Sequence, residues 1–202
     1  LTLKSLMNLL PSTLTEQHYE KTIIGNAAII FQNPMSVLDP LCPVLSQLTE
    51  VVMVRQNVSK GEARLRAEKL LKRLGLPDEL AKKDRLPGEL SGGQCQRILI
   101  AMALACKPDI LLCDEPTTAL DVTVQKQTLD LIRELQKEMN FAILFVTHNL
   151  AVAASICSHL AVMHSGKIVE TGKTKELLQH PKDDYTKMLL SAILRIPNRR
   201  ER

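Results

Sequence analysis

The sequence predicts an α/β fold built on a mostly parallel β-sheet. Continuous apolar runs at 27–31, 109–114 and 141–147 have the length of strands that are buried on both faces, as in parallel sheets. An amphipathic helical pattern at 123–139 separates the last two runs. Alternating buried strands and helices are typical of α/β domains. With 202 residues and 45% hydrophobic content, the chain can bury one sizeable core and a small appended subdomain.

The chain opens with "LTLKSLMNLLPS", which predicts an amphipathic helix. Leu3, Leu6, Leu9 and Leu10 fall near a 3.6-residue period and form one apolar face, and Pro11 marks a break after it. The first residue is not Met, and no targeting segment is visible.

From residue 33 to about residue 89 the pattern becomes helical and charged. Ser59 is a suitable N-cap, and Glu62 three residues later completes the pattern of a capping box. Gly75 ends this helix, and Pro77 follows just beyond it. The stretch therefore predicts a helical subdomain inserted between strands.

The elements after residue 147 continue the α/β pattern. An apolar helix is expected at 150–157, a strand at 159–163, and a turn with an edge strand at 165–172. A final helix and tail are expected at 183–202.

Composition argues against several classes of protein. The net charge of +4 is mild for this length, and the five aromatic residues are too few for a base-stacking nucleic-acid platform. The five cysteines include no CxxC pair, which fits a reducing compartment and argues against a disulfide framework or a zinc site. The longest apolar run, 98–106, is about half of the ~20 residues that a membrane-spanning helix needs.

The string "LSGGQCQR" at 90–97 is the most specific motif. Ser91, Gly92 and Gly93 form a turn with few side-chain atoms, so its backbone N–H groups can approach an anion closely. The turn leads into an apolar helix, and the positive end of the helix dipole favours phosphate. A turn that merely precedes a helix is the alternative interpretation.

A second motif, "ILLCDEPTTALD", places two acids at the end of a predicted buried strand. Open parallel sheets bind ligands at the carboxyl ends of their strands. Asp114 there would be costly without a cation or hydrogen-bond donors, and the Mg²⁺ of a nucleotide supplies one. Glu115 is placed to polarise a water molecule. An ordinary helix cap before Pro116 is the alternative.

These motifs together resemble the nucleotide-binding subunit of an ABC transporter. The strings "LSGGQ", "LLCDEP", "ALD" and "VTH" occur in the order of that family's motifs, over essentially the whole chain. The resemblance implies a P-loop NTPase-like core with an inserted helical subdomain. It also implies that residues 90–94 are the signature motif, in which Ser91, Gly92, Gly93 and Gln94 contact ATP.

The resemblance assigns further roles. Asp114 corresponds to the Walker B acid that serves Mg²⁺, and Glu115 to the general base. Gln32 corresponds to the Q-loop glutamine, which touches Mg²⁺ or the attacking water, Asp121 to the D-loop acid and His148 to the switch histidine. A lone histidine at the end of a buried strand also fits a satisfied core residue, and that interpretation stays open for His148.

Four longer strings narrow the resemblance to the peptide and nickel importers of bacteria: "FQNPMSVLDP", "DEPTTALDVTVQ", "GKIVETG" and "HPKDDYTKMLLSAI". Asn33 and Asn149 stand where acids are usual in that group. The ending "IPNRRER" lacks the longer cysteine-containing tail of many peptide-importer ATPases, which favours the metal-importing branch or a truncated sequence.

A P-loop should precede the opening helix, so we expect the residues before Leu1 to read Gly-Lys-Ser or Gly-Lys-Thr. The similar string at 166–174 has one residue too many between its glycines and comes too late in the chain. The expected parts are a partial nucleotide-binding core (1–32), the helical subdomain (33–89), the remaining core (90–182) and a C-terminal helix and tail (183–202).

The function implied by the resemblance is that of an ATP-binding and ATP-hydrolysing subunit of a bacterial importer for peptides or nickel. ATP and Mg²⁺ are the expected cofactors, with a second ATPase subunit, identical or related, and membrane permease subunits as partners. The expected location is peripheral, on the cytoplasmic face of the inner membrane. Two alternatives remain: an ABC ATPase that acts outside transport, and an inactive fragment that contributes only the signature half-site.

Overall fold

The computed structural model describes residues 25–82, 85–118 and 120–194. The helix predicted at the start of the chain lies outside these residues. The chain forms two compact units, Leu1–Leu144 and Phe145–Arg202. The finer domain boundaries expected at residues 32, 89 and 182 stay predictions.

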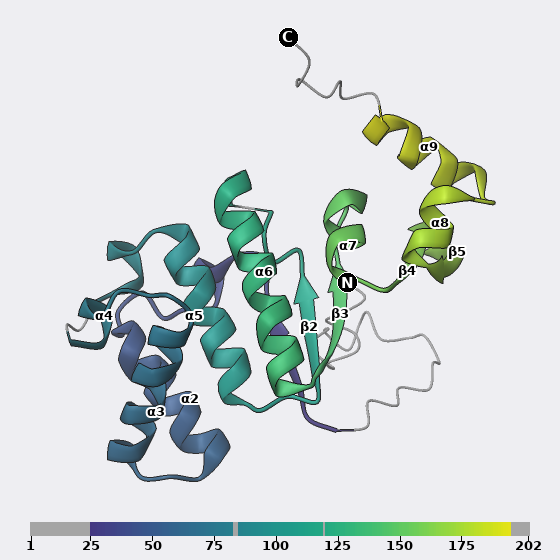
Figure 1. The fold of residues 1–202 in the computed structure, drawn as a ribbon. Helices are drawn as coiled ribbons and strands as arrows, with labels where there is room; N and C mark the ends of the chain where they lie inside the picture. Colours follow the sequence, from purple (N-terminus) through teal and green to yellow (C-terminus); the bar gives the residue numbers. More distant parts are fainter. Residues whose placement is uncertain (1–24, 83–84, 119, 195–202) are drawn as a thin grey trace, which may run out of the picture. The chain divides into compact units, whose positions relative to one another are not determined.

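Parallel strands form the sheet of the first unit (Figure 1). β1 (Ala27–Ile30) pairs in parallel with β2 (Ile110–Asp114), and β3 (Ala142–Val146) follows in the order β1-β2-β3. Asn26 and Asp109 join the entries of β1 and β2, because the Asn26 N–H donates to the Asp109 carboxylate at 2.7 Å. The strand pairing confirms the predicted α/β class.

The strand predicted at 141–147 is less buried than expected. Leu144 and Val146 of β3 are 40% and 37% exposed, whereas Leu111 and Leu112 of β2 are fully buried. β2 is the central strand of the three described, and β3 lies at an edge.

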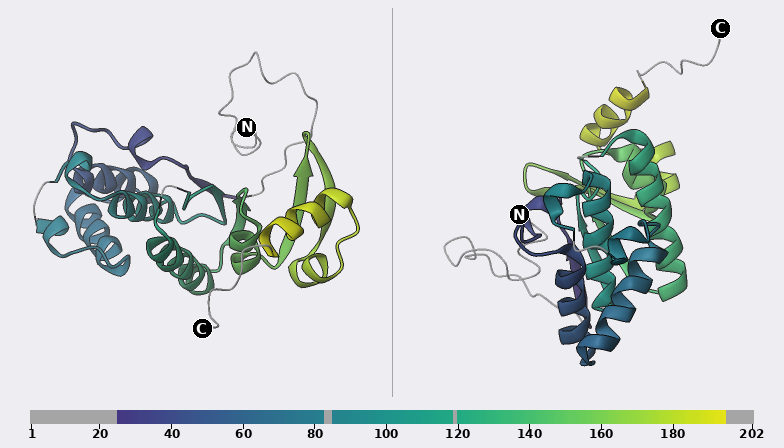
Figure 2. Two further views of the ribbon diagram at one scale, coloured as in Figure 1. Left: turned by 90° about the horizontal axis from the view of Figure 1, so that it is seen from above. Right: turned by 90° about the vertical axis from the view of Figure 1, so that its left-hand side faces the viewer.

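The stretch predicted as a helical subdomain is largely helical. It contains α2 (Val44–Gln56), α3 (Lys60–Arg73) and the short α4 (Glu79–Lys82), between the 3-10 turns η2 (Pro34–Ser36) and η3 (Pro87–Glu89). α2 and α3 pack side by side, as Figures 1 and 2 show.

The C-terminal end of α3 agrees with the sequence prediction, and the N-terminal cap agrees with it in part. Ser59 is the N-cap, and its hydroxyl accepts a hydrogen bond from the Glu62 N–H at 3.3 Å. The Glu62 carboxylate pairs with Arg66 instead of returning to Ser59, so only half of the capping box forms. Gly75 follows the helix with φ of +66°, a backbone conformation that glycine adopts without strain.

α5 (Gly92–Ala105) connects the helical subdomain to the sheet. It packs against α2 and α3 and also against β1. Because it has neighbours on several sides, nine of its fourteen residues are buried, including Ile98, Leu99 and Ile100. This burial accounts for the nearly continuous apolar composition of the helix.

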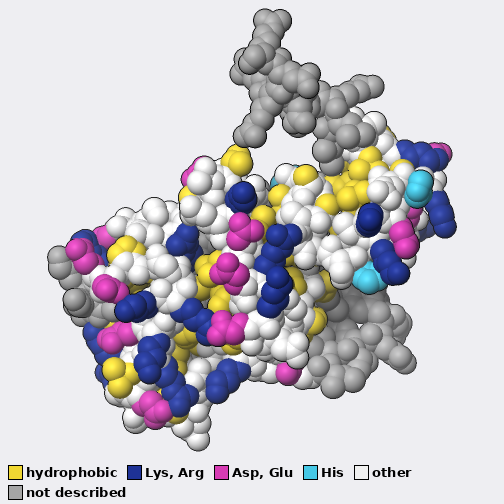
Figure 3. Space-filling view, viewed as in Figure 1, with side chains coloured by type: hydrophobic (Ala, Val, Ile, Leu, Met, Phe, Trp, Pro, Cys, Tyr) yellow, Lys and Arg dark blue, Asp and Glu magenta, His cyan; other side chains and the backbone are white. Residues whose placement is uncertain are grey.

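α6 (Val122–Met139) is amphipathic, as predicted. Leu129, Ile132 and Leu135 form its buried stripe, and Asn140 ends it in the left-handed conformation. The opposite face carries side chains of both charges, which lie interspersed over α6 in Figure 3. Among the described residues, no helix is both long enough and apolar enough to cross a membrane.

The second unit contains α7 (Leu150–Ile156), β4 (His159–His164), β5 (Lys167–Lys173), α8 (Thr174–Gln179) and α9 (Asp184–Leu194). β4 and β5 form an antiparallel hairpin, a two-stranded sheet of their own (Figure 2). Helices α7 and α8 contribute to the apolar core under this hairpin, whose buried members are Ala153, Leu160, Val162 and Leu177.

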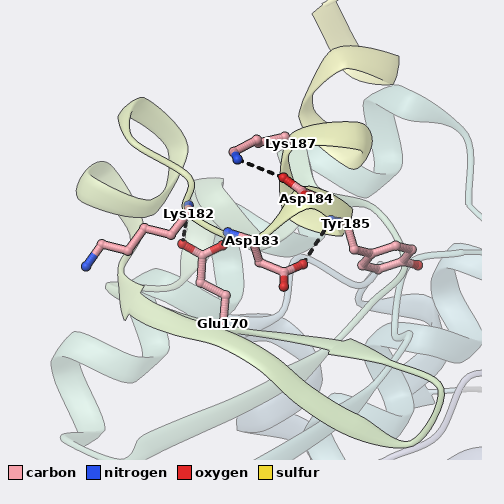
Figure 4. A network of polar contacts seen from close by, with 6 residues as sticks. All are labelled: Glu170, Lys182, Asp183, Asp184, Tyr185 and Lys187. Atoms are coloured by element: carbon pink, nitrogen blue, oxygen red, sulfur yellow. Dashed lines mark hydrogen bonds and ion pairs between the residues drawn. The ribbon is translucent and has the colours of Figure 1, made fainter.

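Glu170 on β5 holds the start of α9 (Figure 4). Its carboxylate accepts hydrogen bonds from the backbone N–H groups of Lys182 at 2.9 Å and Asp183 at 3.1 Å. These bonds, that from Lys182 foremost, hold the pKa of Glu170 below its usual value. The Asp183 carboxylate in turn accepts the N–H of Tyr185 at 2.9 Å. The string "HPKDDYT" therefore forms a hydrogen-bonded loop that leads into α9.

Arg97 joins three elements of the first unit. It lies on α5, and one terminal nitrogen of its guanidinium donates to the carbonyl oxygen of Leu74 at 3.1 Å, at the end of α3. The other terminal nitrogen donates to Gln127 on α6 at 3.2 Å. One side chain thus ties the helical subdomain to the helix that follows the β2 turn.

We expect Arg97→Met to lower the free energy of unfolding by about 1–3 kcal/mol, because it leaves a backbone carbonyl and an amide without their charged donor. Urea unfolding would measure the change. Arg64→Met is the control, since Arg64 is exposed and makes only an i,i+4 ion pair with Glu68. Equal losses in the two variants would contradict the structural role given to Arg97.

Candidate functional site

Two predicted site residues meet at the carboxyl ends of β1 and β2. The parallel register pairs Ile30 with Cys113, so the residues that follow each strand emerge at the same edge of the sheet. Gln32 follows β1 and Glu115 follows β2, and the Gln32 side-chain N–H donates to the Glu115 carboxylate at 3.2 Å. The fold therefore brings together residues that are 83 positions apart in the sequence.

Glu115 has an unusual backbone conformation. Its φ is +46°, in the left-handed region that residues other than glycine rarely adopt. The tight turn after β2 imposes this conformation, and the Thr118 N–H donates to the Glu115 carbonyl at 3.3 Å to close it. Strain of this kind costs about 1–3 kcal/mol and tends to persist at functional sites.

The alternative that the acid pair is a helix cap does not describe this turn. Asp121 is the N-cap of α6, and its carboxylate accepts the Val124 N–H at 2.9 Å. Asp114 and Glu115 lie before that cap, at the end of β2. Asp121, predicted as a nucleotide-contacting acid, thus also begins a helix.

Thr118 is a site residue that the sequence did not reveal. Its hydroxyl donates to the Glu115 carboxylate at 2.9 Å, and the oxygen that accepts this bond is the one that also accepts from Gln32. A threonine three residues after an acid is common in turns, so no sequence signal marks it.

The oxygen donors at this edge fit a magnesium ion. Asp114 is half-buried and is the last residue of β2. The amide nitrogen of Gln32 faces Glu115, which leaves the amide oxygen as a ligand atom. Carboxylate and amide oxygens are hard ligands of the kind that Mg²⁺ prefers.

The turn at residues 91–94, here called the signature turn, begins α5 with a complete capping box. The Ser91 hydroxyl accepts the Gln94 N–H at 3.2 Å, and the Gln94 amide oxygen accepts the Ser91 N–H at 2.9 Å. The Ser-x-x-Gln spacing is the sequence signal for this box. Gln94, predicted to contact ATP, therefore places its side chain on the turn itself.

The two glycines of the signature turn differ in the space available for a side chain. A Cβ on Gly93 would lie 2.9 Å from a methyl carbon of Val124 on α6, so packing excludes a side chain there. A Cβ on Gly92 would meet nothing within 4 Å. Gly92 is exposed at the positive end of a 14-residue helix, a position where a phosphate group fits.

Two titratable groups flank the signature turn. The pKa of Glu89 lies below its usual value, because its carboxylate accepts the backbone N–H of Leu86 and pairs with Arg85. Burial raises the pKa of the Cys95 thiol, so this cysteine stays protonated and unreactive. A cavity of about 250 Å³ lies beside the turn and reaches the loop after α3.

His148 belongs to the second unit. It is exposed and directly precedes Asn149, whose side chain caps α7 by accepting the N–H groups of Ala151 and Val152. The polar cap explains why Asn149 can stand where an acid was expected, since both side chains serve as N-caps. The expectation of a buried core histidine does not describe His148.

Comparisons with known proteins identify the family of this chain. A family model described as ABC transporter matches residues 8–118, more than half of the chain. The chain belongs to the ABC transporter family. The oligopeptide transport ATP-binding protein AmiE of Streptococcus pneumoniae is 45% identical over 179 residues, which are 89% of this chain and 50% of AmiE.

Other members of the ABC transporter family extend the comparison. The glutathione import ATP-binding protein GsiA of Escherichia coli is 45% identical over 169 residues, 84% of this chain and 27% of GsiA. The chain thus spans half or less of the length of these curated relatives.

Two solved structures share the fold. The ATP-binding cassette MJ0796, solved as a dimer in a post-hydrolysis state with ADP and Pi, matches with a TM-score of 0.64 and 32% identity, over 74% of this chain and 63% of that one. Clostridium perfringens cbiO1, part of the ABC transporter complex cbiONQ, matches with a TM-score of 0.67 and 30% identity, over 85% of this chain and 64% of that one.

The two glycines of the signature turn offer a test of their packing. Gly93→Ala should lower the free energy of unfolding by about 1–3 kcal/mol, because its methyl group crowds Val124. Gly92→Ala should change it by less than about 1 kcal/mol, since the added methyl group meets no other atom. Urea unfolding of both variants measures the two changes. Equal destabilisation would contradict the close packing of Gly93 against Val124.

Proposed function

We propose that this chain is part of the ATP-binding and ATP-hydrolysing subunit of a bacterial ABC importer. The observation that carries the proposal is the contact between Gln32 and Glu115 at the carboxyl edge of the parallel strands. This edge holds one amide and two neighbouring acids. They provide the metal ligands and the base that metal-assisted attack of water on a phosphate requires.

In this proposal, Glu115 is the general base that orients a water molecule and accepts its proton. Asp114 and Gln32 hold the Mg²⁺ of MgATP through their oxygens. The ion, when bound, neutralises charge on the β- and γ-phosphates. The strained φ of Glu115 and its hydrogen bonds position the carboxylate before substrate arrives, so less reorganisation is needed during turnover.

The signature turn serves the nucleotide of a second subunit. Ser91, Gly92, Gly93 and Gln94 face the γ-phosphate of ATP that the partner holds, with Asp121 nearby as the D-loop acid. Support comes from the open space around Gly92 and from MJ0796, which was solved as a dimer with ADP and Pi. The partner is an identical or a related ATPase subunit.

His148 is proposed as the residue that contacts the γ-phosphate from the second unit. His148 is exposed and follows the carboxyl end of β3. The helical subdomain at 33–89 is proposed to dock on permease subunits, at the cytoplasmic face of the bacterial inner membrane, where this subunit is peripheral. No nucleic acid is expected as a partner.

The cargo is proposed to be a di- or oligopeptide. AmiE is named for oligopeptide transport, and GsiA is named for the import of glutathione, which is a tripeptide. Nickel, the other cargo that the sequence motifs suggested, has no such support among these relatives. Uptake assays with labelled peptides and with ⁶³Ni²⁺, in cells that lack the complete protein, would separate the two.

Glu115→Gln tests the assigned base. In the complete protein that contains this sequence, the variant should bind ATP with unchanged affinity and lose at least ~99% of turnover, since an amide cannot accept the proton. Phosphate release and equilibrium ATP binding measure the two effects. Glu134→Gln, an exposed acid on α6, should hydrolyse ATP normally. Near-normal hydrolysis by Glu115→Gln would refute the assignment.

Gly92→Ala tests the half-site formed by the signature turn. In the Glu115→Gln background, ATP should drive dimerisation, and Gly92→Ala should abolish it because the methyl group fills the space that the γ-phosphate needs. Light scattering with and without ATP measures the dimer. Gly61→Ala on α3 is the matched control, because a Cβ there also meets nothing within 4 Å. A dimer that tolerates Gly92→Ala would contradict the proposed contact.

A further inference from the structure

We propose that Thr118 is a positioning residue for Glu115, holding the carboxylate in the orientation from which it activates water. This inference rests on the proposed function, in which Glu115 is the general base. Nothing in the motif pattern assigns a task to Thr118, which lies in the turn between β2 and α6.

The hydrogen bond from Thr118 is short and local. Its hydroxyl lies 2.9 Å from the Glu115 carboxylate oxygen that also accepts the Gln32 amide at 3.2 Å. The two donors come from different elements, one from the turn after β2 and one from the end of β1. Both bonds have an ionised acceptor, so together they hold this carboxylate oxygen in place.

The backbone of the turn makes the bond geometrically secure. The Thr118 N–H donates to the Glu115 carbonyl at 3.3 Å, so the two residues are linked by both backbone and side chain. The left-handed φ of Glu115 belongs to the same turn. A β-branched residue is restricted at χ1, which limits the orientations open to the Thr118 hydroxyl.

The neighbouring threonine fixes the turn to the rest of the fold. Thr117 is buried, with 4% of its surface exposed, and its hydroxyl accepts a hydrogen bond from Gln125 on α6 at 2.9 Å. Thr118 is exposed. The two threonines therefore have different roles. Thr117 anchors the turn to α6, and Thr118 orients the carboxylate of Glu115.

Thr118 also supports Glu115 when Gln32 is otherwise engaged. The proposed function assigns the Gln32 amide oxygen to Mg²⁺, so the amide nitrogen that donates to Glu115 follows any movement of this side chain toward the cation. The bond from Thr118 does not depend on Gln32, because Thr118 and Glu115 share one turn. Thr118 therefore keeps the carboxylate oriented while Gln32 serves the cation.

The experiment compares Thr118→Val, Thr118→Ser and Thr171→Val in the complete protein. Valine keeps the shape of threonine without the donor, so kcat should fall about tenfold while KM and ATP affinity stay within about twofold. Serine keeps the donor and should restore kcat to within about threefold of the wild type. Thr171→Val removes an exposed threonine from β5 of the second unit and should have no effect.

A coupled measurement strengthens the comparison. In the Glu115→Gln background, Thr118→Val should cause no further loss of the residual rate, because the group that it positions no longer acts as a base. A further tenfold loss in that background would overturn the inference.

The outcomes separate the inference from the proposed function. An active wild type, an inactive Glu115→Gln and a fully active Thr118→Val would overturn the role of Thr118 and leave the proposed function standing. Equal losses in Thr118→Val and Thr118→Ser would also overturn it, since they would show a dependence on shape instead of on the donor. A wild type without ATPase activity, or an active Glu115→Gln, would overturn both.

Discussion

The burial of α5 is the constraint on which the first unit depends. This helix packs against β1 and against α2 and α3, so one element supports both the sheet and the helical subdomain. Its buried residues keep it fixed along its length, and its capped N-terminus stays exposed. The signature turn is therefore presented on a rigid support, which is the arrangement that precise recognition of a phosphate needs.

The parallel register of β1 and β2 is the second constraint. It brings Gln32 and Glu115 to one edge, where the turn after β2 places Glu115 in a strained conformation. The strain is offset by hydrogen bonds within the turn and by the bond between Gln125 and Thr117. Structure that over-determines a strained acid is typical of a site prepared for chemistry.

Contacts between elements link this site to the rest of the unit. Gly93 packs directly against Val124, and Arg97 joins the end of α3 to α6 through Leu74 and Gln127. The signature turn, the helical subdomain and α6 therefore share direct contacts.

The sequence alone determined the family and most elements, because motif order and hydrophobic period are local properties: α3, α6 and α7 begin and end within about a residue of their predicted bounds. Only the tertiary structure decided which side chains meet. The hydrogen bonds of Glu115 with Gln32 and Thr118 depend on the register of the strands and on the turn after β2. The packing that excludes a side chain at Gly93 depends on the approach of α6. The partial exposure of β3 is likewise a tertiary property, since its apolar sequence is that of a strand buried on both faces.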